Sequence, residues 1–300
     1  MSVPVAYLAI VLIWSTTPLA IQWSTQGTGF AFAVLARMLI GTVVAALLVL
    51  VWRIRFPLHA RARRAYLVGG VGLFGAMALT YWGARYVNSG LVSVLFGLSP
   101  LMAGVLAAVW LGEKSLTRAK VAGTLLGAGG LAVIFVHGSA LGGEHALAGL
   151  AALLAAVFIY SASLVSLKRI GDDSPPLATT VGSLTVSLPL FALVWLMSDG
   201  HLPEAMPARS GAAIAYLGVF GSVIGFALYY YVIKHLDTGK VALITLITPV
   251  LALLLGNVLN GEAIGLRLWA GTSLILLGLT VHQGETWLPM LRRLRAGPVG

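Results

Sequence analysis

Two prolines stand in the middle of long apolar runs, each directly after a hydroxyl residue: Ser99-Pro100 in LSPLMA and Thr248-Pro249 in ITPVLA. A proline inside a helix offers no N–H to the carbonyl four residues before it. In lipid that carbonyl needs a side chain, a water molecule or a neighbouring helix, and the Ser99 and Thr248 hydroxyls could serve. We predict that Pro100 and Pro249 are hinges at which two spans bend to open and close alternate ends of a central cavity. The alternative is a pair of tolerated kinks that only shape packing.

A second group of residues combines aromatic rings with hydroxyls in the predicted spans. An aromatic cavity dotted with hydroxyls suits a substrate that has an apolar body and few polar groups. Aromatic residues near span ends can also form ordinary interfacial belts, and this alternative stays open. The predicted substrate-binding residues are Trp14, Ser15, Tyr81, Ser99, Tyr160, Phe226, Tyr230 and Thr248.

Ionisable residues are rare inside the apolar runs. Arg37 is the only charged residue away from the ends of a predicted span, and it either holds a substrate carboxylate or extends its side chain to the outer interface. Glu113 and Glu262 follow glycines at span ends, where helix termination and interhelical contact are favoured over proton coupling. No acidic residue or histidine lies at a span centre, so facilitated diffusion or metabolite exchange fits at least as well as proton antiport.

Composition sets the class of protein. Apolar residues make up 59% of the 300 positions and charged residues 9%, with a mean hydropathy of +0.97. A soluble domain carries roughly 25% charged residues, so we predict an all-α polytopic membrane protein. The chain has no cysteine, which excludes disulfides and thiolate sites. We expect no metal and no cofactor.

The apolar runs predict ten transmembrane helices, at 3–21, 30–52, 66–85, 90–111, 118–136, 146–167, 177–197, 212–234, 240–259 and 268–284. With the N-terminus inside, fifteen of the 19 Lys and Arg residues face the cytoplasm and three face outward. This asymmetry predicts that both termini are cytoplasmic. The net charge of +10 lies in short loops between spans, so we expect contact with the lipid bilayer and none with nucleic acid.

The sequence is duplicated. A shift of 149 residues brings Tyr81 onto Tyr230, Gly90 onto Gly239, Pro100 onto Pro249 and Glu113 onto Glu262. We predict an N-terminal repeat over 1–140, a C-terminal repeat over 141–288 and a basic cytoplasmic tail over 289–300. Each repeat holds five spans, an odd number, so the two repeats should have opposite orientations in the bilayer, as in many secondary transporters.

The chain resembles the EamA family of the drug/metabolite transporter superfamily. The likeness rests on LIWSTTPLAIQ and VFIYSASLVSLKR, which open the two halves, on the stretch from Tyr81 to Pro100 and on the two Gly-Glu pairs. Within the family it is similar to the YddG-type exporters of aromatic amino acids. The resemblance implies two five-helix halves around a cavity and export across the inner membrane.

We therefore expect a multi-pass transporter of the bacterial inner membrane that exports small metabolites by alternating access and works as a monomer. The favoured substrates are amino acids with aromatic or other apolar side chains, such as phenylalanine, tryptophan, methionine and threonine. Small drugs and cationic metabolites are the alternative. An integral membrane enzyme is disfavoured because the sequence lacks the reactive motifs, and a channel because one duplicated chain could enclose its own path.

Overall fold

The structure, a computed structural model, describes residues 2–112, 117–135, 145–198, 200–236 and 238–284. Every regular element in these ranges is helical. The first half contains α1 (Val3–Thr25), α2 (Phe30–Val51), α3 (Ala60–Gly83), α4 (Ser89–Phe96), α5 (Ser99–Leu111) and α6 (Arg118–Phe135). The second half contains α7 (Ala146–Ile170), α8 (Pro176–Ser198), α9 (Ala208–Tyr216), the π-helix η2 (Leu217–Ile224), α10 (Gly225–His235), α11 (Thr238–Asn260) and α12 (Leu266–His282).

Eight helical stretches among the described residues are long and apolar enough to cross a membrane, so the chain is a multi-pass helical membrane protein. One of the eight combines α4 and α5, and another runs from α9 through η2 into α10. The remaining two predicted spans coincide with α6 and the shorter apolar helix α12. The largest boundary difference is at α3, which begins at Ala60 rather than residue 66 because its basic first turn continues the helix beyond the apolar run.

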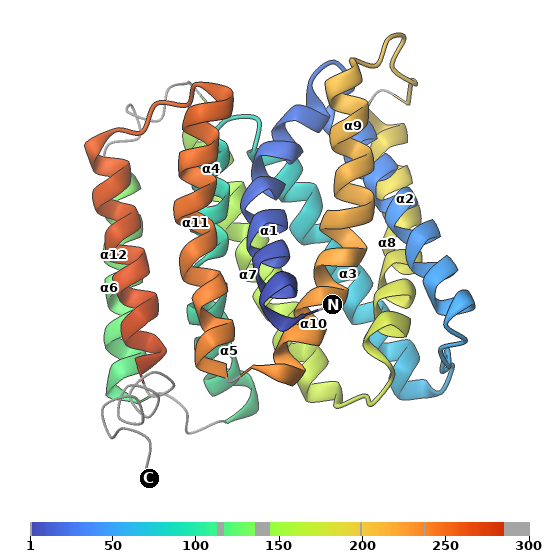
Figure 1. Cartoon of the computed structure of the whole chain (residues 1–300), viewed down its shortest axis with the longest axis horizontal. Helices are drawn as coiled ribbons and strands as arrows, with labels where there is room; N and C mark the ends of the chain where they lie inside the picture. The colour runs from blue at the N-terminus through green and yellow to red at the C-terminus, as the bar shows by residue number, and fades with distance from the viewer. Residues whose placement is uncertain (1, 113–116, 136–144, 199, 237, 285–300) are drawn as a thin grey trace.

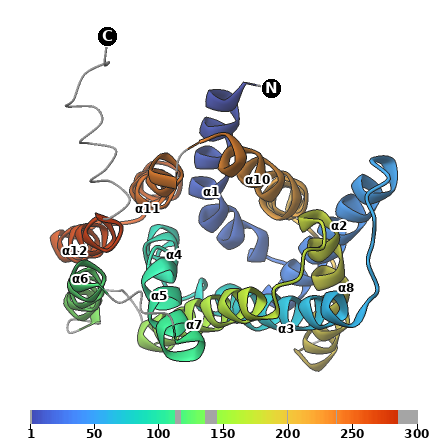
Figure 2. The same cartoon turned by 90° about the horizontal axis from the view of Figure 1, so that it is seen from below.

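The two halves interleave instead of forming separate domains. Helix α3 packs against α7 and α8 of the second half, and α1 packs against α10 and α11. In Figure 1, α1 begins partway up the bundle and runs upward, whereas α12 runs downward and ends at the lower end. In the view from below, α6 and α12 lie together at one edge (Figure 2). Both halves contribute to one large apolar cluster, so neither has a core of its own.

Glycines allow α6 and α12 to approach closely. A methyl group on Gly123 would overlap the carbonyl oxygen of Gly278, and one on Gly130 would lie 2.5 Å from the carbonyl oxygen of Gly271. Small residues permit such backbone contact in membrane helices. In the sequence repeat Gly123 corresponds to Gly271 and Gly130 to Gly278, so each glycine contacts the counterpart of the other.

A second contact recurs between the halves. A methyl group on Gly72 of α3 would overlap the Ser163 side chain of α7, and one on Gly221 of η2 would lie 3.7 Å from Thr17 Oγ1 of α1. Gly72 and Gly221 are 149 residues apart, and Thr17 and Ser163 are 146 apart. The repeated sequence therefore forms repeated packing, each time between helices of different halves.

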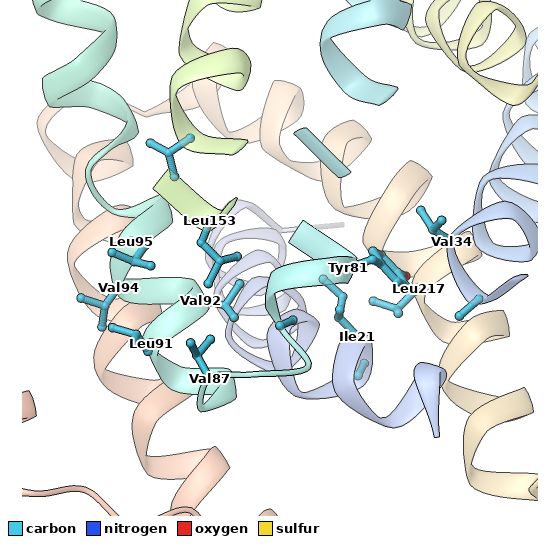
Figure 3. Packing of buried hydrophobic residues seen from close by; sticks show 14 of the residues in the cluster. Ile21, Val34, Tyr81, Val87, Leu91, Val92, Val94, Leu95, Leu153 and Leu217 are labelled. Carbon is cyan, nitrogen blue, oxygen red and sulfur yellow. The ribbon is translucent and has the colours of Figure 1, made fainter. Parts of the chain in front are cut away.

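The core lies between these interleaved helices. Figure 3 shows Leu91, Val92 and Leu95 of α4 near Leu153 of α7. It also shows Tyr81 of α3 beside residues of other helices, among them Ile21 and Leu217. The packing of these buried side chains fixes the positions of the helices, and therefore of the polar groups at the helix ends.

We predict that Gly123→Ala destabilises the protein by about 1–3 kcal/mol, because the added methyl group overpacks the α6–α12 contact. The matched control is Gly129→Ala on the same helix, where no atom lies within 4 Å of the added methyl group. That change should be neutral or stabilising by up to ~1 kcal/mol, since alanine restricts the unfolded chain. Thermal unfolding of both variants in detergent would check the prediction, and equal shifts would contradict it.

Candidate functional site

The span that contains Pro100 is interrupted. Helix α4 ends at Phe96 and α5 begins at Ser99, with Pro100 in its first turn. The Ser99 hydroxyl donates to the Phe96 carbonyl at 2.6 Å. The prediction that Ser99 satisfies the carbonyl left free by Pro100 is confirmed.

The second proline lies beside this interruption. Helix α11 contains Pro249 and stays helical on both sides of it, and a methyl group on Gly97 would lie 3.6 Å from Pro249 Cγ. The two proline sites therefore meet in the structure, but only the first divides its helix. Gly97 precedes Pro100 by three residues, whereas the corresponding residue before Pro249 is Leu246; glycine has the greater backbone freedom. Motion at either proline stays a prediction.

One aromatic cluster joins α1 to α10. The ring centroid of Trp14 lies 6.3 Å from that of Phe226 and 4.9 Å from that of Tyr229. Aromatic pairs at such separations are attractive. All three residues are half-buried. Tyr229 was not among the predicted site residues, and the side chain of the predicted Tyr230 lies outside those that the structure describes.

A second aromatic cluster joins α4 to α7 at the interruption. The rings of Phe96 and Tyr160 are 6.0 Å apart, and the Ser161 hydroxyl donates to the carbonyl of Ser99 at 3.3 Å. Phe96 and Tyr160 are half-buried. Phe96 was missed by sequence reasoning, although its place next to Gly97 could have indicated it.

The predicted polar residues Ser15 and Thr248 are buried. Within the part of the chain that the structure describes, the Ser15 hydroxyl has no hydrogen-bond partner. By the repeat, Ser15 corresponds to Ser161 and Thr248 to Ser99. Among the described residues, Ser161 and Ser99 are joined by a hydrogen bond, whereas their counterparts Ser15 and Thr248 are not.

Arg37 lies inside the protein. It is 5% exposed, its Nε donates to Ser222 Oγ at 3.1 Å, and its Nη1 donates to the Tyr81 hydroxyl at 3.4 Å. The side chain therefore joins α2 to η2 and α3 and does not extend to an interface. Tyr81 is fully buried and belongs to this group rather than to either aromatic cluster. Ser222 is a further polar contact that the sequence did not single out.

Polar side chains form a hydrogen-bonded group at the end of the bundle where α1 and α11 end and α4 begins, and this is the upper end in Figure 1. We call Gln22, Trp23, Asn260 and Glu262 the polar clasp. Gln22 Nε2 donates to the carbonyls of Ala84 and Val87 at 3.1 and 2.6 Å. Asn260 Nδ2 donates to Gln22 Oε1 at 3.2 Å and to Glu262 Oε1 at 3.0 Å. Trp23 Nε1 donates to Asn260 Oδ1 at 3.2 Å.

Glu262 ties this clasp to α4. The backbone N–H of Gly90, in the first turn of α4, donates to Glu262 Oε2 at 3.5 Å. A carboxylate is stabilised near a helix N-terminus by the unpaired N–H groups and the helix dipole. The prediction that Glu262 makes an interhelical contact is confirmed; its repeat counterpart Glu113 lies outside the described residues.

The site can bind through aromatic faces, hydroxyls and one guanidinium. Among the described residues, no three His, Cys, Asp or Glu side chains converge as metal ligands would.

Comparison with known proteins places this arrangement among transporters. A model of the EamA-like transporter family matches the chain twice, over residues 2–136 and 147–282. A solved crystal structure aligns with a TM-score of 0.65 at 24% identity, covering 98% of both chains, which shows a shared fold.

Two curated relatives are 27% identical to the chain. One is an uncharacterised transporter of Archaeoglobus fulgidus, aligned over 90% of this chain and 95% of the relative. The other, from Streptantibioticus cattleyicolor, is described as a probable terminal-alkyne amino-acid exporter and aligns over 86% of this chain and 85% of the relative.

We predict that Ser99→Ala destabilises the protein by about 1–2 kcal/mol, because the Phe96 carbonyl loses its donor. In a Pro100→Ala background the N–H of residue 100 becomes available to that carbonyl, so Ser99→Ala should cost less there. Thermal unfolding of the four variants in a double-mutant cycle measures the coupling. Effects that add within about 0.5 kcal/mol would show that the hydroxyl does not replace the missing N–H.

Proposed function

Because this chain belongs to the EamA-like transporter family, we propose that it is a secondary transporter of the bacterial inner membrane that exports amino acids with apolar side chains. The family and the transporter names of the relatives indicate a transporter rather than an enzyme. The amino-acid substrate is supported by the name of the S. cattleyicolor relative and by the site itself.

The observation that carries the proposal is the pair of half-buried aromatic clusters, Trp14–Phe226–Tyr229 and Phe96–Tyr160. Aromatic faces bind an apolar body, and an aromatic pair adds about 0.5–1.5 kcal/mol beyond area burial. Membrane-buried acidic groups that would neutralise a cationic drug are not found: the described carboxylates, Asp172, Asp173, Glu204 and Glu262, lie in loops or at helix ends. The site therefore favours amino acids over small cations.

We propose that the chain crosses the membrane ten times in two inverted five-helix repeats, with both termini cytoplasmic. The twofold match to the family model and the exchanged Gly123–Gly278 and Gly130–Gly271 contacts support the duplication. The opposite directions of α1, which runs upward, and α12, which runs downward (Figure 1), support an even number of crossings. Inverted repeats provide two related conformations, open to opposite sides.

On this topology the polar clasp seals the outer end. Its hydrogen bonds join α1, α4 and α11, the helices beside the two proline sites. Alternating access then requires the clasp to open while the Pro100 and Pro249 regions rearrange. In this mechanism the gate consists of a small number of neutral hydrogen bonds and one carboxylate. Substrate binding can supply the free energy needed to break these contacts.

Transport by purified protein in liposomes tests the function. We expect efflux of phenylalanine, tryptophan, methionine or threonine with stimulation by the same amino acid on the opposite side, which is the signature of a carrier. Trp14→Ala should lower transport about tenfold, since stacking and area burial on an indole are lost. Trp110→Ala, which changes an exposed ring on α5, is the control. Transport of cationic drugs alone, or flux without stimulation, would overturn the proposal.

The clasp makes a separate prediction, for which the absence of native cysteine is an advantage. A single cysteine in place of buried Ser15 should react slowly with a membrane-impermeant thiol reagent added outside right-side-out vesicles. Asn260→Ala should raise that rate, because it removes the clasp contacts to Gln22, Trp23 and Glu262. Glu204→Ala in the exposed 200–207 region is the control, and an unchanged rate in Asn260→Ala would count against the clasp as a gate.

A further inference from the structure

Arg37 is a buried cation whose described partners are all neutral. Its polar partners there are the Ser222 and Tyr81 hydroxyls, and the centroid of the Tyr81 ring is 5.9 Å from Cζ. No described carboxylate pairs with it, and the sequence places the remaining acidic residues outside the predicted spans. A buried charge without a counterion is unfavourable, and inside a membrane protein it marks a functional position.

The fold itself does not require a charge at this position. The backbone carbonyl of Arg37 would lie 3.2 Å from a methyl group on Gly218 of η2, and the backbone carbonyl of Ser183 of α8 would lie 2.8 Å from one on Gly70 of α3. Arg37 and Ser183 are 146 residues apart, the shift that also relates Thr17 to Ser163, and so correspond in the repeat. The same helix contact is therefore made once by a serine and once by an arginine. The packing of the helices does not need the guanidinium.

The guanidinium also has a neighbouring position without a side chain. A methyl group on Gly221 would lie 3.4 Å from Arg37 Nη2 and 3.7 Å from Thr17 Oγ1, both ordinary contact distances. Nη2 makes no hydrogen bond to the described residues. The Tyr81 hydroxyl accepts from Arg37, and its own proton has no acceptor there. Gly221 thus adjoins Arg37 Nη2, which can donate to an oxyanion, whereas the Thr17 hydroxyl donates to the Ile13 carbonyl at 2.7 Å.

This position lies next to the Trp14 cluster. A methyl group on Gly225, four residues after Gly221, would lie 3.2 Å from Trp14 Nε1, and residues four apart on a helix are about 5–6 Å apart. That separation matches the distance from the carboxylate of an amino acid to its side chain. Thr17 and Trp14 are half-buried and border the position from α1. The π-helical turns of η2 supply Ser222 and Gly221, and π-helical segments are frequent at functional sites.

We propose that Arg37, together with Tyr81, forms the subsite that holds the carboxylate of the transported amino acid, and that Ser222, whose hydroxyl donates to the Leu217 carbonyl and accepts from Arg37, positions the guanidinium. This inference rests on the proposed function and specifies its chemistry. The guanidinium binds the carboxylate by charge-assisted hydrogen bonds, and the Trp14 cluster takes the apolar side chain. A ligand without a carboxylate leaves the buried cation unpaired and is rejected for that reason.

Ligand binding to purified protein in nanodiscs tests the subsite. The probes are phenylalanine, its carboxamide and phenylacetate, which separate the carboxylate from the ammonium group. Wild type should bind phenylalanine at least about tenfold tighter than the carboxamide. Arg37→Gln should bind both as weakly as wild type binds the carboxamide, and Tyr81→Phe should lose part of the preference. Arg85→Gln, an exposed arginine at the end of α3, is the control.

Thermal unfolding without ligand separates this role from a structural one. If Arg37 serves binding, Arg37→Gln should be at least as stable as wild type, because a buried unpaired charge is removed. A folded Arg37→Gln or Arg37→Lys protein that keeps the full preference for carboxylate would overturn the inference. So would a wild type that binds no carboxylate in an Arg37-dependent way.

The outcomes also separate this inference from the proposed function. If liposomes carry no amino acid but phenylacetate binding depends on Arg37, the subsite stands and the amino-acid substrate fails. If phenylalanine and its carboxamide are carried equally well, amino-acid export stands and the carboxylate subsite fails.

Discussion

The structure depends on the rule that a polar backbone group in an apolar environment must find a partner within the protein. Helices satisfy it everywhere except where the chain departs from regular geometry. At Pro100 the departure is compensated by the Ser99 hydroxyl, 2.6 Å from the Phe96 carbonyl. At the beginning of α4, the N–H of Gly90 donates to Glu262. The irregular places are thus where side-chain chemistry gathers, and they are where helices of the two halves meet.

Repeated packing forms the frame of the structure, and we propose that departures from the repeat serve the function. Gly72 and Gly221, and the exchanged glycines of α6 and α12, repeat the same packing in both halves. The differences are single residues: Gly97 corresponds to Leu246 and accompanies an interrupted helix in one half only. Arg37 stands where the other half has Ser183. On the proposed inverted topology, a symmetric frame with asymmetric side chains could bind an asymmetric substrate while retaining two related conformations.

Much of the fold was predictable because the apolar runs are long and interrupted by basic loops. The predicted spans agree with the helical stretches to within a few residues, apart from the start of α3. The role of Ser99 followed from the chemistry of proline, and the contact of Glu262 from its place after Gly261. Tyr229, Phe96 and Ser222 were missed as site residues, since hydroxyls and rings on apolar helices give no sign of the face on which they pack.

The sequence by itself determined the class of membrane protein, the positions of the helices and the duplication, because hydropathy and repeated residues act locally along the chain. Only the tertiary structure decided which groups meet. It brought Gly97 against Pro249, joined α1 to α4 and α11 through the polar clasp, and buried Arg37 between Ser222 and Tyr81. These contacts join residues up to 238 positions apart. They arise from the interleaving of two halves, which no local pattern encodes.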